Sequence, residues 1–269
     1  MLESAPAGVL KDGAQKKGEQ ASCAVLVMSC DAYSDLWKPF FALLHQYWPE
    51  CPFPVYLGTN WTAYDGRGVT SLLAGDGEWS ERLRLCLEQI ASDYVLLLLE
   101  DYFLDKPIST REILRHLDSL DELQGAMLRL YPRPGPDTRV PGNAQIGRID
   151  VHAPYRMSTQ PAIWHRAQLL RLIVDEESIW EFEWKGTVRS KQLRDGFYAT
   201  WTKAFPFRHV LERGEWFWLA ARHYQKQGIG CDFEARSVMS PWSGMVKTLN
   251  RLRKNTTNAV LPARLRRRK

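Results

Sequence analysis

Short apolar runs alternate, along the first half of the chain, with longer segments whose apolar residues recur every three or four positions. The short runs are typical of buried strands and cover residues 23–29, 53–60, 68–75, 94–101 and 125–132. The segments with helical spacing lie between them, at 34–48, 80–91 and 109–120. Strands that alternate with helices predict an α/β fold with a mostly parallel, Rossmann-like central sheet flanked by helices.

The most apolar run, YVLLLLED at 94–101, ends in two adjacent carboxylates, Glu100 and Asp101. Ligands of open parallel sheets bind outside the carboxyl ends of the strands, so these acids and the polar residues Ser29, Asp31 and Thr59 become candidates. Paired carboxylates can hold a hard divalent cation that bridges phosphates. The alternative is that the two acids only end the strand and face water.

A second carboxylate pair, Glu181 and Glu183, stands in the segment IWEFEW, between Trp180 and Trp184. If this segment is extended, the spacing of two places both glutamates on one face, so that both can point into a cleft lined by the tryptophans. Aromatic faces pack on sugar rings, and apolar surroundings raise a carboxylate pKa toward that of a general base. The alternative is a pair of surface acids beside core aromatics.

Charge divides the chain unevenly. The 269 residues carry a net charge of +5, but the chain after Glu234 has ten basic residues and no acid, which leaves −5 on the rest. We expect a disordered leader at 1–22, a folded domain at 23–237 and a basic tail at 238–269. The tail suits an anionic membrane surface. Binding to nucleic acid and a merely solvated tail are the alternatives.

No apolar run reaches the length of a membrane-spanning helix, and the N-terminus lacks the order of a signal peptide. The five cysteines form no C-x-x-C pair, which argues against a zinc site and a disulfide framework and for a reducing compartment.

Several blocks of the sequence resemble bacterial GT-A-type glycosyltransferases of surface-polysaccharide and lipopolysaccharide assembly. The resemblance spans residues 24–230 and is carried by VLVMSCDAYSDLWKPFFALLHQYWP, FPVYLGTN, YVLLLLEDYFL, QPAIW and IWEFE. It implies a single GT-A-like domain with a nucleotide-sugar half at 23–131 and an acceptor half at 148–237.

The resemblance also implies roles for individual residues. The donor-binding set is Ser29, Asp31, Thr59, Arg82, Glu100 and Asp101. The acceptor side takes Gln160, Trp180 and Trp184, and the catalytic set is Glu181 as first choice of base, Glu183 as second, and Asp101. Mg²⁺ or Mn²⁺ is expected on Glu100 and Asp101. The chain departs from the family's Asp-x-Asp motif, because Glu100-Asp101-Tyr102 has no second carboxylate two residues after Asp101, and this leaves metal dependence open.

The sequence therefore predicts an inverting glycosyltransferase that moves a sugar from a nucleotide-sugar donor to a glycan or lipid-linked acceptor in bacterial surface-polysaccharide synthesis. We expect it in the cytoplasm, held peripherally on the inner face of the plasma membrane by its tail, with no nucleic-acid partner. The alternatives are a non-catalytic GT-A-like scaffold or carbohydrate-binding protein and, on the tail alone, a nucleic-acid-binding protein.

Overall fold

The computed structural model describes residues 21–193, 196–212 and 214–240. Within them the chain builds one large sheet of nine strands, in the order β3-β2-β1-β4-β9-β6-β10-β8-β7. The strands of this sheet are β1 (Cys23–Met28), β2 (Val55–Thr59), β3 (Val69–Leu73), β4 (Tyr94–Leu99), β6 (Met127–Arg129), β7 (Thr138–Val140), β8 (Asn143–Arg148), β9 (Ala162–His165) and β10 (Phe197–Thr200).

The sheet is mostly parallel. β1 pairs in parallel with both β2 and β4, β2 with β3, and β6 with β10. β9 runs antiparallel between β4 and β6, so β4 and β6 point the same way, and the antiparallel hairpin of β7 and β8 closes the far edge. The carboxyl ends of β1, β2, β3, β4, β6 and β10 therefore meet at one edge of the sheet.

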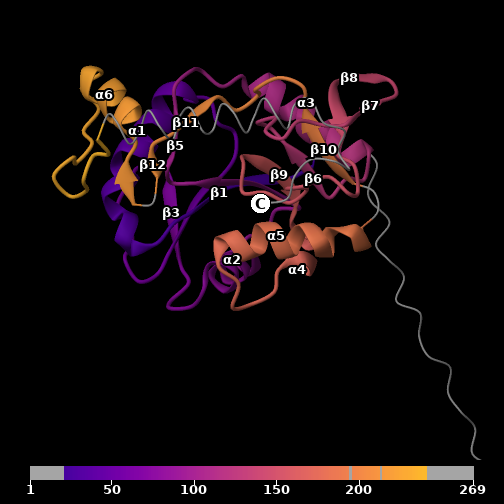
Figure 1. The fold of residues 1–269 in the computed structure, drawn as a ribbon, viewed down its shortest axis with the longest axis horizontal. Helices are drawn as coiled ribbons and strands as arrows, with labels where there is room; N and C mark the ends of the chain where they lie inside the picture. The colour runs from indigo at the N-terminus through magenta and orange to yellow at the C-terminus, as the bar shows by residue number, and fades with distance from the viewer. Residues whose placement is uncertain (1–20, 194–195, 213, 241–269) are drawn as a thin grey trace, which may run out of the picture.

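Helices cover both faces of the sheet (Figure 1). Residues of α1 (Trp37–Tyr47), α3 (Thr110–Glu122) and α6 (Trp218–Lys226) belong to the apolar core on one face. Residues of α2 (Trp79–Glu88), α4 (Arg166–Leu172) and α5 (Ile179–Arg189) belong to the core on the other face. The predicted α/β class, with a mostly parallel sheet between helices, is confirmed.

Side-chain alternation explains why the central strands read as unbroken apolar runs. In β1, Val25 and Val27 pack into one core, whereas Ala24, Leu26 and Met28 pack into the other. A strand buried on both faces needs apolar residues at every position. β4, also buried throughout, follows the same rule and brings Glu100 to the edge of the sheet.

The remaining elements are short. They are β5 (Tyr102–Leu104), which pairs antiparallel with β11 (Phe207–His209), the β12–β13 hairpin (Leu211–Glu212 and Glu215–Trp216), and the 3-10 helices η1 (Asp31–Leu36) and η2 (Ser190–Gln192). Every helix among the described residues is too short or too polar to cross a lipid bilayer.

The two predicted chain ends fall largely outside the described residues: only 21–22 of the leader and 238–240 of the tail are described. Packing continues into that last segment, because Val238 forms a bridge with Trp216 and the Met239 amide donates to the Trp216 carbonyl at 2.9 Å.

Candidate functional site

The candidate site lies at the carboxyl edge of the sheet, where strand order reverses. From β1 the chain continues to β2 and β3 on one side, and from β4 onward it builds the other side. The crevice beside such a reversal is where doubly wound sheets bind their ligands. Ser29 follows β1 and Glu100 follows β4, so these two residues flank the switch point.

Arg82 reaches into this switch point from α2. Its side chain is buried, and its guanidinium donates to the Ser29 carbonyl at 2.5 Å while its Nε has no hydrogen-bond partner. Burial raises the pKa of the neighbouring Cys30 thiol, and the charge of Glu100 raises it further, whereas Arg82 opposes them. Arg82, Cys30 and Glu100 are thus close enough to influence one another, with Arg82 facing inward rather than toward solvent.

Asp31 and Thr59 occupy the ends of β1 and β2 in different ways. The Asp31 carboxylate accepts hydrogen bonds from the amides of Asn60, Trp61 and Thr62, which lowers its pKa despite an opposing desolvation cost. This carboxylate already fixes the loop after β2. Thr59 is fully buried, and its hydroxyl has no hydrogen-bond partner.

Glu100 and Asp101 stand side by side at the end of β4. Burial raises the pKa of Glu100, and the adjacent charge of Asp101 adds to the rise. Asp101 forms an ion pair through Oδ2 with His209 Nε2 at 2.6 Å, whereas its Oδ1 is buried without a hydrogen-bond partner. His209 reaches Asp101 because β11 pairs with β5, a contact between distant segments that sequence reasoning missed.

The charges of the acidic pair and of Glu183 all act on Tyr102. Burial raises the pKa of the Tyr102 phenol well above its ordinary value, and the charges of Asp101, Glu183 and Glu100 add to the rise. Thr159 joins the groups physically: its amide and hydroxyl donate to Glu183 Oε1 at 2.7 and 2.9 Å, and its hydroxyl also hydrogen-bonds Tyr102. The two predicted carboxylate sites therefore converge through Glu183, by way of Thr159 and Tyr102.

Arg129 supports this cluster from the end of β6. It is fully buried, donates to the carbonyls of Pro134 and Tyr155 at 2.6 Å each, and places its positive charge near Glu183. Desolvation lowers the Arg129 pKa to about 10. Gln160, predicted on the acceptor side, follows Thr159 and has a buried Oε1 without a hydrogen-bond partner.

Arg236 brings the end of the described chain to the same region. It forms two hydrogen bonds with the Asp35 carboxylate, at 2.7 and 2.8 Å, and its guanidinium lies 4.3 Å from the centre of the Tyr33 ring. Its charge also acts on Glu100. The first basic residue after Glu234 is therefore packed against η1.

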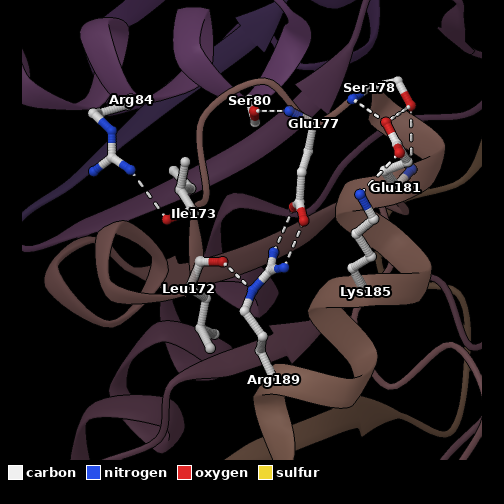
Figure 2. Close-up of polar contacts among 9 residues, drawn as sticks. All are labelled: Ser80, Arg84, Leu172, Ile173, Glu177, Ser178, Glu181, Lys185 and Arg189. Carbon is white, nitrogen blue, oxygen red and sulfur yellow. Dashed lines mark hydrogen bonds and ion pairs between the residues drawn. The ribbon is translucent and has the colours of Figure 1, made fainter.

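The extended interpretation of IWEFEW is wrong. Ser178 begins α5 with a capping box, in which the Glu181 carboxylate accepts from the Ser178 amide and Glu181 donates its amide to the Ser178 hydroxyl (Figure 2). Residues two apart in a helix point in directions about 200° apart. Glu181 and Glu183 therefore cannot face one cleft together.

Glu181 points away from the other site residues. Lys185 lies 2.9 Å from Glu181 Oε1, and this bond, together with the bonds from Ser178, lowers the Glu181 pKa to about 2 (Figure 2). For Glu183, by contrast, burial raises the pKa although Thr159 opposes the rise. The geometry does not support the preference for Glu181 over Glu183, because of the two only Glu183 is placed among the site residues and has a raised pKa. Which glutamate acts as the base stays a prediction.

Trp180 and Trp184 do not line a cleft with the glutamates. Their side chains are 74% and 58% exposed, on the solvent side of α5. The helical period that separates Glu181 from Glu183 turns both tryptophans outward, one turn apart.

Among the described residues, no three His, Cys, Asp or Glu side chains are grouped so as to hold a metal ion. Glu100 and Asp101 supply only two carboxylates, and Asp101 Oδ2 is already in an ion pair with His209. Metal binding at this pair stays a prediction.

No protein-family model matches the chain, and no curated protein is significantly similar to it in sequence. Among solved structures, it is similar to S. aureus TarS 1–349, with 16% identity and a TM-score of 0.42 over 69% of this chain and 59% of that one. For a complex of TarS 1–349 with UDP-GlcNAc, the identity is 14% and the TM-score 0.44, over 78% of this chain and 67% of that one.

A protein from Desulfovibrio desulfuricans G20, assigned as a nucleotide-diphospho-sugar transferase, gives 10% identity and a TM-score of 0.46, over 87% of this chain and 98% of that one. The chain spans 46% of the longer TarS structure. At TM-scores below 0.5 these similarities carry no argument about function, which therefore rests on the residues described above.

Proposed function

We propose that the protein is a glycosyltransferase that moves a sugar from a nucleotide-sugar donor to a glycan or lipid-linked acceptor. The observation that carries this proposal is that Thr159 binds Glu183 of α5 and also interacts with Tyr102, the residue directly after Glu100 and Asp101 at the end of β4. An acidic pair at the switch point suits the donor side, and a separate carboxyl with a raised pKa suits proton abstraction.

The donor is proposed to bind across the ends of β1, β2 and β4. The buried polar groups there that lack hydrogen-bond partners include the Thr59 hydroxyl and the Arg82 Nε. A buried guanidinium favours an anionic group such as a diphosphate, because the low dielectric of the interior strengthens the attraction. The Asp31 carboxylate has the supporting role of fixing the loop after β2, since its hydrogen bonds go to that loop.

A divalent cation, Mg²⁺ or Mn²⁺, belongs to the proposal as a ligand of Glu100 and Asp101. The buried Asp101 Oδ1, which lacks a hydrogen-bond partner, fits such a ligand role. When bound, the cation supplies charge neutralisation for the diphosphate.

Glu183 is proposed as the general base of an inverting transfer. Its carboxylate accepts the proton of the acceptor hydroxyl while that oxygen bonds to the anomeric carbon and the bond to the nucleoside diphosphate breaks. Thr159 holds the carboxylate in position, and Gln160, with its unpartnered Oε1, is proposed to hold the acceptor. A role in surface-polysaccharide synthesis, and membrane association through the basic tail, are the further parts of the proposal.

The test begins with a thermal-shift screen of the full chain against UDP-, GDP-, CMP- and dTDP-sugars, each with and without Mg²⁺ or Mn²⁺. A donor that binds only the native state raises the melting temperature. Nucleotide release from the stabilising donor is then measured for Glu183→Gln and for its matched control, Glu181→Gln.

We expect Glu183→Gln to lower turnover by about 10²–10⁴-fold while donor binding persists. Glu181→Gln removes the same charge from the same helix and is expected to keep near-normal turnover. Near-normal turnover in the Glu183→Gln variant would show that Glu183 is not the base. Donor binding without turnover in the wild-type protein favours the non-catalytic alternative.

A further inference from the structure

A ladder of aromatic rings leads from the carboxylate cluster along the same edge of the sheet. Tyr102 lies 4.3 Å from Phe207, centroid to centroid, and Phe207 lies 4.6 Å from Tyr131. Tyr131 follows β6, whose carboxyl end shares the edge with that of β4. The ladder therefore connects the Tyr102 ring with the surface that follows β6.

Two cations lie over the last ring of this ladder. The Lys203 Nζ is 5.0 Å and the Arg133 Cζ is 5.7 Å from the Tyr131 ring centre. Both side chains are exposed, and neither has an ion-pair partner among the described residues. The acid in the loop after Arg133, Asp137, accepts a hydrogen bond from the Asp150 amide at 2.9 Å.

A third cation, Arg139, also lies over an aromatic ring. The Arg139 Cζ lies 5.7 Å from the centre of the Trp201 ring, and Trp201 is 40% exposed. Trp201 follows β10, two residues before Lys203, and β10 pairs with β6. This edge therefore combines aromatic faces, which pack on sugar rings, with positive charges that form no ion pair within the described part of the chain.

We propose that Tyr131, Arg133 and Lys203 form a subsite for an anionic group, phosphate or carboxylate, on the sugar acceptor. The proposal rests on the proposed glycosyltransferase function and adds the chemical class of its acceptor. The donor takes the β1–β4 side of Tyr102, and the ladder leaves Tyr102 toward β6, so an acceptor reaching Glu183 from that side passes over this surface. Arginine and lysine bind both kinds of anion, and the arginine fork suits phosphate or carboxylate geometry.

The test measures binding of three probes to the full chain by saturation-transfer NMR and calorimetry: glucose 6-phosphate, glucuronate and glucose. The variant Arg133→Gln/Lys203→Gln removes both cations. The matched control, Arg222→Gln/Lys226→Gln, removes the same charge from the exposed side of α6. Both variants are also screened for thermal stabilisation by the donor.

We expect the wild-type chain to bind at least one anionic probe more tightly than glucose, with an affinity that falls as salt rises. Arg133→Gln/Lys203→Gln is expected to weaken that binding roughly tenfold, while the α6 variant leaves it unchanged. The probe that responds, phosphate or carboxylate, identifies the group.

Equal affinities for glucose and the anions, or an equal loss in both variants, overturn the subsite. Failure of the proposed function has a different signature, because no donor then stabilises even the wild-type chain. A bound donor together with anion binding that ignores Arg133 and Lys203 refutes only the subsite.

Discussion

The inward and outward sides of α5 use similar residues for different purposes. On the outward side, Glu181 is bound by Lys185 and by the Ser178 cap, and its pKa falls to about 2. On the inward side, Glu183 is bound by Thr159 and burial raises its pKa. Two glutamates in one helix thus differ in proton affinity, because burial raises the pKa of Glu183 whereas Lys185 and the Ser178 cap lower that of Glu181.

Two ion pairs made by side chains of this helix also differ in burial (Figure 2). Arg189 forms two 2.6 Å bonds to Glu177, a residue that is almost fully buried, whereas the Lys185–Glu181 pair is exposed. Glu177 is also tied to α2, since its amide donates to the Ser80 hydroxyl at 3.0 Å. The buried pair fixes where α5 sits, and α5 in turn carries Glu183 to the site.

Removal of the buried partner should have the largest effect on stability. Arg189→Ala leaves the Glu177 carboxylate buried and uncompensated, so we expect a loss of about 3–5 kcal/mol in the free energy of unfolding. Urea denaturation measures it. Adding Glu177→Gln to Arg189→Ala should recover part of the loss, because the buried charge is then gone. An unchanged denaturation midpoint in Arg189→Ala contradicts the anchoring role.

Removal of the Thr159 hydroxyl should alter the pH profile rather than the fold. The Thr159 bonds favour the ionised form of Glu183 and oppose the effect of burial. Thr159→Val leaves the amide bond and deletes the hydroxyl bond, so the Glu183 pKa should rise further. A base acts in its ionised form, and the acidic limb of kcat/KM should therefore move to higher pH, with turnover at neutral pH reduced roughly tenfold.

A matched control for this change lies on the same helix. The Thr187 hydroxyl accepts from the Met157 amide at 3.2 Å, in the segment that precedes Thr159. Thr187→Val deletes a comparable bond without touching Glu183, so its acidic limb should stay in place. If both variants shift the limb equally, the effect arises from the segment and not from Glu183.

Burial on both faces made most of the fold predictable from sequence. Strands such as β1 and β4 need apolar residues at every position, and the helices between them repeat with the helical period. α5 was missed because its alternating Trp and Glu residues imitate the period of a strand. The signal that finds it is the capping-box spacing Ser178-x-x-Glu181, which also occurs as Ser109-x-x-Glu112 at the start of α3, where the Ser109 hydroxyl caps the helix.

The site was predictable where it follows a strand and unpredictable where it depends on distant contacts. Glu100 and Asp101 could be found because they end the most apolar run. His209 and Thr159 could not, because the pairing of β11 with β5 and the packing of α5 on the segment before β9 join residues far apart in sequence. No local pattern distinguishes either residue from an ordinary surface histidine or threonine.

The smallest effect is expected on the outward side of α5. Trp180→Ala and Trp184→Ala truncate exposed side chains, so each should change the unfolding free energy by no more than about 0.5 kcal/mol. Phe182→Ala, measured alongside, must lose stability clearly, because Phe182 is fully buried and its ring lies 4.9 Å from that of Trp79. Turnover in both tryptophan variants should stay near normal, since the bonds that hold Glu183 come from Thr159 and neither tryptophan takes part in them. A turnover loss in Trp184→Ala without a stability loss would return this tryptophan to the acceptor site.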